Sequence, residues 1–350
     1  MRRVRHLFSF RARAVLAGLL VAALIPTGVV LAATHGSAAP ARSHPPMLMA
    51  RAADSQAGGQ RLLLTRCSQA NGCFLYSRYD RVTKPLRIPY FEFDEDAQQA
   101  TLGIGPGGHQ VAAYGRCGAE LHNCGLYVYD FATGIERRLP VSNHGGAFMY
   151  PTVSGDRVAY GYNPRGRFAP SSGFGIYWSY LDGTRMHRLH TEPLDALRSP
   201  PQLALSGIHL AYAGASQLTS CLDQTHVRII NLTSGRDQLL ATGTTNTDVF
   251  SPAWDGDALY YARDYFTQAN YRHDLTRAGI VRSRVERYSL ATAKTQTSQW
   301  TRLAVATVEP DGQDMLYQLV MRQSAENGVY SVGPLAFHQI KAHRKLAPAS

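Results

Sequence analysis

The chain has 350 residues, enough for one large domain or two ordinary ones; only 17% are charged, whereas 19 are tyrosine. Few charges and many tyrosines suit half-buried strands better than helices, so we expect an all-β fold. The formal net charge is +11, and five of these charges come from arginines before residue 14. The rest of the chain has no Lys/Arg block, which excludes a nucleic-acid-binding surface.

The N-terminal segment has the order of a secretory signal. Five arginines precede an apolar stretch at 14–33, and small residues follow it. We expect a signal peptide over 1–39, cleaved near residue 33 or 39, a flexible leader over 40–46, and no stable membrane span afterwards. The alternative is a retained N-terminal membrane anchor, because twenty apolar residues can span a bilayer. The protein is therefore predicted to be secreted or to reside in the cell envelope.

From residue 47 to 345 the chain repeats short apolar runs separated by glycine-centred turns. The turns lie 48 to 56 residues apart, at Gly59, Gly107, Gly155, Gly207, Gly256 and Gly312. The third apolar run of five repeats ends at nearly the same interval, at Tyr79, Tyr129, Tyr180, Ile230 and Tyr288. A period of this length, built from strands with no helical pattern between them, is typical of a propeller. We predict a six-bladed β-propeller of four-stranded antiparallel blades.

The second repeat shows its four strands most clearly. They are expected over 100–104, 110–114, 125–129 and 135–139, with alternating apolar residues and glycine turns between them. The first repeat has a weak first strand at 47–50. The sequence therefore leaves open whether the chain ends close the ring by sharing one blade.

These repeats resemble the TolB-like, WD40-like (PD40) β-propeller family. Ser251 to Gly256 (Ser-Pro-Ala-Trp-Asp-Gly) is similar to the first half of the family's repeat, and Val128 to Gly134 (Val-Tyr-Asp-Phe-Ala-Thr-Gly) to the second. The resemblance spans nearly all of 47–340 and implies a propeller fold. It implies little about function, because each motif is turn chemistry. Most repeats lack the family's Ser-Pro-Asp-Gly turn, which indicates a divergent member.

Five cysteines fit an exported protein. Cys67 and Cys73 bracket one predicted turn, and Cys117 and Cys124 bracket another, so facing strands would bring each pair within disulfide distance. Zinc is the competing interpretation, but gaps of five and six residues are wider than the usual two to four. We predict two disulfides, with Cys221 as a small apolar residue.

Two motifs in the sequence resemble enzyme motifs but lack the context that an enzyme requires. Gly103 to Gly108 has the glycine spacing of a dinucleotide-binding loop, but that loop requires a helix next, and here a strand follows. His144-Gly145-Gly146 resembles an esterase oxyanion loop, yet the sequence has no Gly-x-Ser-x-Gly elbow. It also has no His-Glu-x-x-His pair of zinc ligands. We expect no cofactor and no metal site.

In a propeller, the loops after the second and fourth strands surround one mouth of the central channel. That face carries the longer insertions, at 163–172 and 264–279. Loops on a rigid scaffold usually carry binding, so we expect ligands there. The candidate binding residues are Glu92, Asp94, Asp96, Arg116, His144, Arg165, Arg263, Tyr271 and His273.

Each group of candidates has an ordinary alternative. The acidic residues Glu92, Asp94 and Asp96 could bind a cation or a basic peptide, or they could simply be solvated. The second strand ends in arginine in five repeats, at Arg66, Arg116, Arg165, Arg263 and Arg322. Such arginines could form a ring that attracts carboxylates or phosphates, or they could be solvated strand ends. His144 and His273 have no neighbour at metal-ligand spacing and suit ordinary surface positions.

We therefore expect a non-catalytic module that binds or scaffolds a peptide, protein or glycan of the cell envelope. The alternative is a propeller hydrolase or lyase with a polar site at the central channel. Converging side chains with perturbed pKa values would favour the enzyme, and a flat aromatic face with a polar rim would favour binding.

Overall fold

The structure is a computed structural model. It describes residues 49–52, 61–68, 72–79, 82–86, 88, 100–116, 124–141, 146–164, 175–189, 201–217, 223–266, 280–298, 300, 304–310, 315–320, 327–332 and 343–345. The predicted signal peptide (1–39), the leader (40–46) and Cys221 lie outside these ranges.

The described residues form strands almost throughout, which confirms the expected all-β class. A short 3-10 turn, η2 (Pro106–Gly108), precedes β6. The strands of the first three repeats are β1 (Met49–Ala52), β2 (Arg61–Ser68), β3 (Gly72–Tyr79), β4 (Val82–Pro85), β5 (Thr101–Ile104), β6 (Gln110–Arg116), β7 (Gly125–Asp130), β8 (Ile135–Arg138), β9 (Ala147–Ser154), β10 (Arg157–Asn163), β11 (Gly175–Tyr180) and β12 (His187–Leu189). Those of the last three are β13 (Gln202–Ser206), β14 (His209–Gln217), β15 (Asp223–Asn231), β16 (Asp237–Thr242), β17 (Thr247–Asp255), β18 (Ala258–Phe266), β19 (Ile280–Ser289), β20 (Lys294–Thr297), β21 (Ala304–Pro310), β22 (Met315–Val320), β23 (Asn327–Val332) and β24 (His343–Lys345).

Consecutive strands pair antiparallel in sets of four. Strands β1–β4, β13–β16, β17–β20 and β21–β24 each form a sheet in chain order, and β5–β12 form one eight-stranded sheet. That larger sheet consists of two four-strand meanders, joined only where β5 meets β9 through the parallel pair Ile104↔Ser154. We had expected separate four-stranded sheets, but here the first strands of two repeats approach closely enough to hydrogen-bond.

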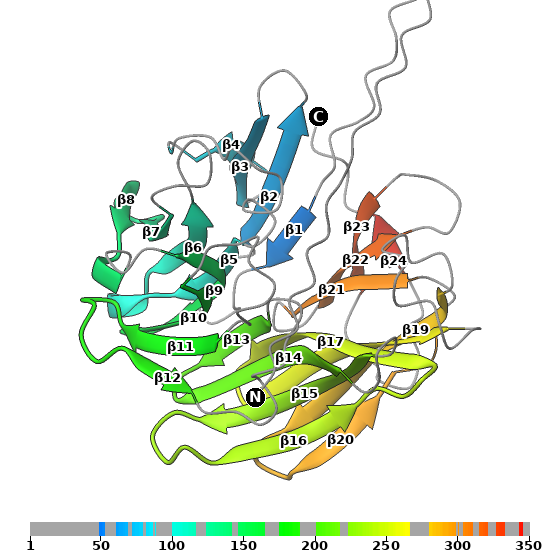
Figure 1. Ribbon diagram of the computed structural model, residues 1–350. Coiled ribbons are helices and arrows are strands. Elements are labelled where there is room, and N and C mark those ends of the chain that lie inside the picture. The colour runs from blue at the N-terminus through cyan, green and yellow to red at the C-terminus, as the bar shows by residue number, and fades with distance from the viewer. Residues whose placement is uncertain are drawn as a thin grey trace, which may run out of the picture. The chain divides into compact units, whose positions relative to one another are not determined.

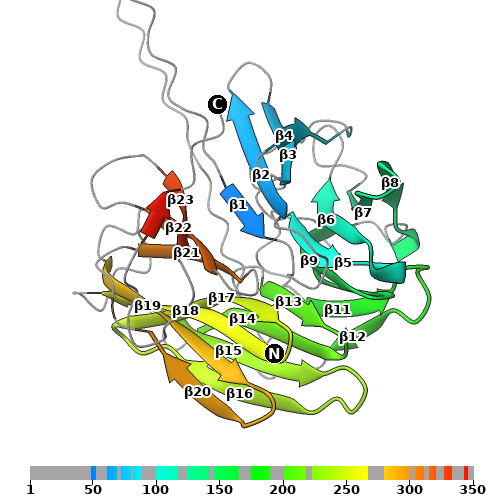
Figure 2. The same ribbon diagram turned by 180° about the vertical axis from the view of Figure 1, so that it is seen from behind.

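The first strand of each set contacts the first strand of the next. Strand β5 contacts β9, β9 contacts β13, β13 contacts β17, and β17 contacts β21, while β1 contacts both β5 and β21. Figures 1 and 2 show the same succession from opposite sides. Strand β1 pairs with β2, and β21–β24 form a sheet of their own, so the first and last described strands belong to different sheets.

The predicted turns are located correctly wherever the structure describes them. The turn glycines Gly107, Gly155, Gly207 and Gly256 have φ between +55° and +73°, a conformation that favours glycine. Gly59 and Gly312 lie outside the described residues. Strand β6 follows η2 directly, so the segment with dinucleotide-like spacing is a strand-to-strand turn, as predicted.

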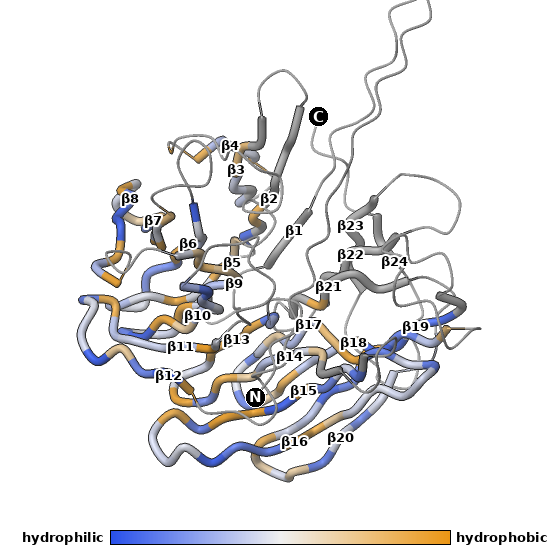
Figure 3. The backbone as a smooth tube through the Cα atoms, in the orientation of Figure 1, coloured by the Kyte–Doolittle hydropathy of each residue, from blue (hydrophilic) through white to orange (hydrophobic). Residues whose placement is uncertain are grey.

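The hydrophobic core lies between successive four-strand sets. One cluster packs β2 and β3 against β6 and β7, and includes Leu63, Leu75 and Tyr114. A second cluster joins β6 and β7 to β9 and β10. Two further clusters extend the core from β10 to β19. The fourth strands are mostly exposed, and Figure 3 shows β8 mainly in the colour of hydrophilic residues. Apolar side chains therefore hold neighbouring sheets face to face.

Candidate functional site

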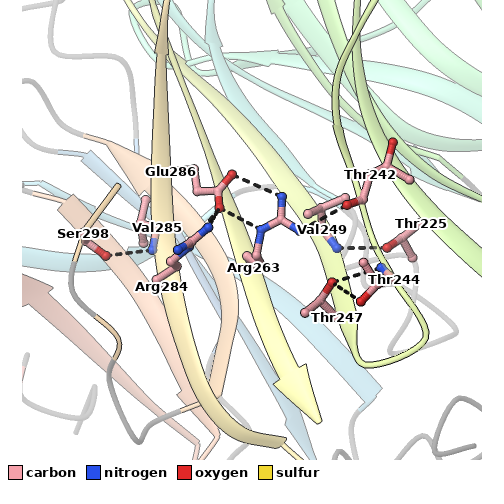
Figure 4. Close-up of polar contacts among 10 residues, drawn as sticks. All are labelled: Thr225, Thr242, Thr244, Thr247, Val249, Arg263, Arg284, Val285, Glu286 and Ser298. Carbon is pink, nitrogen blue, oxygen red and sulfur yellow. Dashed lines mark hydrogen bonds and ion pairs between the residues drawn. The ribbon is translucent and has the colours of Figure 1, made fainter. Parts of the chain in front are cut away.

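The candidate site lies on the β18–β19 pair of the fifth repeat and extends from the middle of this pair to its loop end. At its centre the carboxylate of Glu286 is 4% exposed and accepts hydrogen bonds from two arginines. Arg263 Nε and Nη2 donate to its Oε1 and Oε2 at 2.7 and 3.4 Å. Arg284 Nε and Nη2 donate to Oε1 at 2.9 and 2.6 Å. We call these three residues the Glu286 cluster; Figure 4 shows both guanidinium groups pointing toward the carboxylate.

Strand register explains this convergence. Arg263 lies opposite Arg284, and Tyr261 lies opposite Glu286. Residues two apart on a strand share a face, so these four side chains occupy one face of the β18–β19 pair. Glu286 thus lies diagonally from Arg263 and on the same strand as Arg284, and a single carboxylate compensates two facing positive charges.

The cluster is anchored to the preceding repeat. Arg263 Nη1 donates to the carbonyl oxygen of Thr242 in β16 at 3.1 Å. The loop from β16 to β17 is short and closed by its own hydrogen bonds, among them Thr244 N to Thr247 O at 2.9 Å. Thr225 Oγ1 accepts from Val249 N at 2.9 Å, which joins β15 to β17 (Figure 4). Arg263 therefore links two neighbouring sheets.

The pKa of Glu286 reflects its two arginine partners. Burial acts to raise it, but the hydrogen bonds and charges of Arg263 and Arg284 outweigh burial, and the pKa lies below its usual value. Burial and the neighbouring Glu286 carboxylate raise the pKa of Tyr261. At neutral pH the Glu286 carboxylate is therefore ionised and forms a structural ion pair with its two arginines, while the Tyr261 phenol is neutral.

Beyond the cluster, an aromatic and cationic surface faces the loop side. The guanidinium carbon of Arg282 lies 4.6 Å from the ring centroids of both Tyr265 and Trp300. Arg284 lies at the same distance from Trp300, and the Tyr265 and Trp300 rings meet edge to face at 6.5 Å. Arg282 is exposed. We call Arg282, Tyr265 and Trp300 the Trp300 platform.

The second repeat has a similar arginine. Arg116, at the end of β6, donates to Oε1 and Oε2 of Glu136 in β8 at 2.7 and 3.1 Å and stacks on Tyr127 at 4.0 Å. Tyr114 donates to the same carboxylate at 2.6 Å. Arg116 and Arg263 are therefore neither bare solvated strand ends nor vacant anion sites, because each already holds a carboxylate of this chain.

The other candidate binding residues lie outside the described residues. They are Glu92, Asp94, Asp96, His144, Arg165, Tyr271 and His273. Their binding roles stay predictions. Within the described ranges, no group of three or more His, Cys, Asp or Glu could hold a metal ion. In the same part of the chain, no helix is long and apolar enough to cross a membrane.

Three of the four cysteines in the predicted disulfides lie within the described residues. Cys67 and Cys73 are register partners in β2 and β3, a spacing that a disulfide can bridge. Cys124 is buried and disulfide-bonded, but Cys117 lies outside the described residues. The two predicted pairings therefore remain predictions.

Sequence reasoning missed the partners of the arginines. Glu136 and Glu286 stand 20 and 23 residues after Arg116 and Arg263, on different strands of their repeats. A usable signal was that Glu286 is the one acidic residue in β19, a strand that carries three arginines. Nothing local in the sequence pairs Trp300 with Arg282.

The sequence matches no known protein family and no curated protein. Solved structures are similar in fold only. A puromycin-hydrolysing peptidase of Mycobacterium tuberculosis has a TM-score of 0.50 at 14% identity, over 86% of this chain and 53% of that one. An oligogalacturonate lyase in complex with manganese has a TM-score of 0.47 at 11% identity, over 83% and 82%. The β-propeller domain of the Trilobed protease from Pyrococcus furiosus has a TM-score of 0.47 at 8% identity, over 83% and 81%.

These neighbours are β-propeller proteins, and the chain has a fold of that class. It spans about half the length of the peptidase. At such low identity the likeness extends to the fold alone.

Proposed function

We propose that the protein is a six-bladed β-propeller of the TolB-like kind that acts outside the membrane as a non-catalytic binding or scaffolding module. Counting the eight-stranded sheet as two blades gives six sets of four strands. The contacts between first strands, which return from β21 to β1, support closure around an axis.

The ligand is a peptide, protein or glycan of the cell envelope, and it meets the loop face of the fifth blade. The Trp300 platform is the observation that carries this proposal. Its exposed Arg282 has no carboxylate partner among the described residues, and its two aromatic rings stand beside that charge. Arginine and large aromatic side chains are enriched in binding hot spots because they bury much area and also hydrogen-bond.

The Glu286 cluster supports binding rather than catalysis at this position. A general acid or base works best with a pKa near neutrality, whereas Glu286 is buried and shifted the other way. Its two arginines hold the strand ends and orient the platform above them. The alternative, a hydrolase or lyase with a site at the central channel, remains a second proposal, because the structural neighbours include a lyase and a peptidase.

The test is capture of cell-envelope components by the protein lacking residues 1–39. We expect Trp300→Ala and Arg282→Ala to reduce capture of a specific component at least tenfold. Arg236→Ala is the matched control, because Arg236 is also an exposed arginine but lies at the opposite end of its sheet. Equal capture by parent, Arg282→Ala and Arg236→Ala proteins would contradict the proposed site. Turnover of a captured glycan or peptide by the parent protein would favour the enzyme instead.

A further inference from the structure

A pocket of about 500 Å³ lies between the first two four-strand sets, at the ends of the strands opposite the Trp300 platform. It is bounded by the start of β2, the end of β3, the start of β4 and the turn between β7 and β8. Its volume is in the range of small-molecule sites. Its lining residues include Arg61, Tyr79, Val82, Lys84, Tyr129 and Phe131.

Arg61 is held in place by neutral partners. Its Nε donates to Gln110 Oε1 and its Nη1 to Ser77 Oγ, both at 2.7 Å. Its guanidinium carbon lies 4.1 Å from the ring centroid of Phe131 and 4.7 Å from that of Tyr79. A guanidinium has five N–H donors, so at least three have no acceptor among the described residues. The stacked rings leave the N–H edge of the group to meet a ligand.

The described lining of this pocket is positively charged. Arg61 and Lys84 both line it, and no acidic residue is among the described residues that do so. Burial lowers the pKa of Arg61, although Tyr79 and Tyr129 act in the opposite direction. An arginine remains protonated under all ordinary conditions, so the described lining of the pocket keeps a half-buried positive charge with no carboxylate beside it.

The rim of the pocket is apolar and open. Tyr79 and Val82 are 42% and 54% exposed, and Ile135, directly after the lining residue Gly134, is 63% exposed. These are three of the four exposed large hydrophobic side chains in the described part of the chain. Apolar surface grouped beside an unpaired cation suits a ligand that has both an apolar body and a negative charge.

We propose that this pocket binds a small organic acid, with its carboxylate on the N–H edge of Arg61 near Lys84 and its ring or aliphatic body against Tyr79 and Phe131. A carboxylate can accept two parallel hydrogen bonds from the edge of a guanidinium. The exposed Tyr79 and Val82 favour an anion with an apolar body over a bare anion such as phosphate. The site goes beyond the proposed loop-face function, because it involves other sheets and the opposite strand ends. Either proposal can fail without the other.

The experiment measures binding of matched acid and amide probes by ligand-observed NMR and calorimetry. The pairs are indole-3-acetate with indole-3-acetamide, phenylacetate with phenylacetamide, and cyclohexanecarboxylate with its carboxamide; inorganic phosphate is the anion without an apolar body. We expect at least one acid to bind at least tenfold more tightly than its amide. Phosphate at the same concentration should not displace it.

Variants locate the binding. Lys84→Glu and Arg61→Lys should each weaken the bound acid at least fivefold, whereas Lys294→Glu, which changes an exposed lysine on β20, should leave its affinity unchanged. Circular dichroism of each variant checks the fold, and Lys84 is exposed, so its replacement leaves the core intact. Equal binding of acids and amides, no acid binding at millimolar concentration, displacement by phosphate, or an unchanged affinity of the Lys84→Glu protein would each overturn the proposal.

Discussion

Arg263 lies directly opposite Arg284 in the register of β18 and β19, and both guanidinium groups bond to the same buried oxygen, Oε1 of Glu286. Like charges in opposite positions destabilise a strand pair, so this arrangement depends on the carboxylate. It also fixes the end of the hairpin that carries the Trp300 platform. The Glu286 cluster is therefore a structural element next to the proposed binding surface.

Removing the charge of Glu286 should destabilise the protein markedly. The Glu286→Gln protein is expected to lose about 3 kcal/mol of unfolding free energy, because two partly buried arginines lose their counterion. Asp156→Asn is the control, since Asp156 is 61% exposed and meets Arg157 at 3.5 Å; its change should stay within about 0.5 kcal/mol. Urea denaturation measures both. A loss below about 1 kcal/mol in Glu286→Gln would contradict the structural role of the cluster.

Acid should destabilise the protein through His226. This side chain is buried in β15, its Nε2 has no hydrogen-bond partner in the described structure, and burial and then Arg228 lower its pKa. Below about pH 6.5 the unfolded chain binds a proton that the folded state does not, so stability falls as the pH drops. We expect a smaller drop in melting temperature between pH 7.5 and 5.5 for His226→Phe than for the parent. The exposed His187 gives the control, and His187→Phe should behave like the parent.

Gly103 should tolerate no side chain. A Cβ at this position would clash with the carbonyl oxygen of Val153, where β5 and β9 approach each other. Gly103→Ala should therefore cost about 2–3 kcal/mol. Gly207 has φ of +56° with open space around it, so Gly207→Ala should cost only about 1 kcal/mol of backbone strain. Chemical denaturation of the two variants gives the comparison, and an equal or smaller cost at Gly103 would argue against this close approach of the strands.

The predicted disulfides can be tested by counting the free thiols of the protein. In the denatured, unreduced protein we expect a single reactive thiol, that of Cys221. Peptide mapping should recover the pairs Cys67–Cys73 and Cys117–Cys124. The register partnership of Cys67 and Cys73 supports the first pair. Three or more reactive thiols in protein purified from an oxidising compartment, or a crosslink between Cys67 and Cys124, would contradict the pairing.

Local signals predicted the strands well. The third strands of the first and third repeats end at Tyr79 and Tyr180 as expected, and those at Tyr129, Ile230 and Tyr288 end one residue later. The glycine turns at Gly155 and Gly256 also lie where they were placed. Both signals are local, because alternation and positive φ depend on a few neighbouring residues.

The candidate site was only partly predictable. The second strand of the second repeat ends at Arg116 as predicted, whereas β18 continues past Arg263 to Phe266. The partner of neither arginine was predicted. Glu136 comes from the fourth strand of its blade and Glu286 from the third, so no fixed offset identifies them. The Arg61 pocket escaped notice because its walls come from two different repeats.

The amino-acid sequence by itself determined the all-β class, the repeat and its turns, because strand alternation and glycine conformation are properties of neighbouring residues. Only the tertiary structure decided which charges are neutralised. Arg263 has its carboxylate because β18 and β19 pair in one register, whereas Arg61 meets only the neutral Gln110 and Ser77 among the described residues. Compensation of charge depends on distances between strands, and these are established only when the sheets pack.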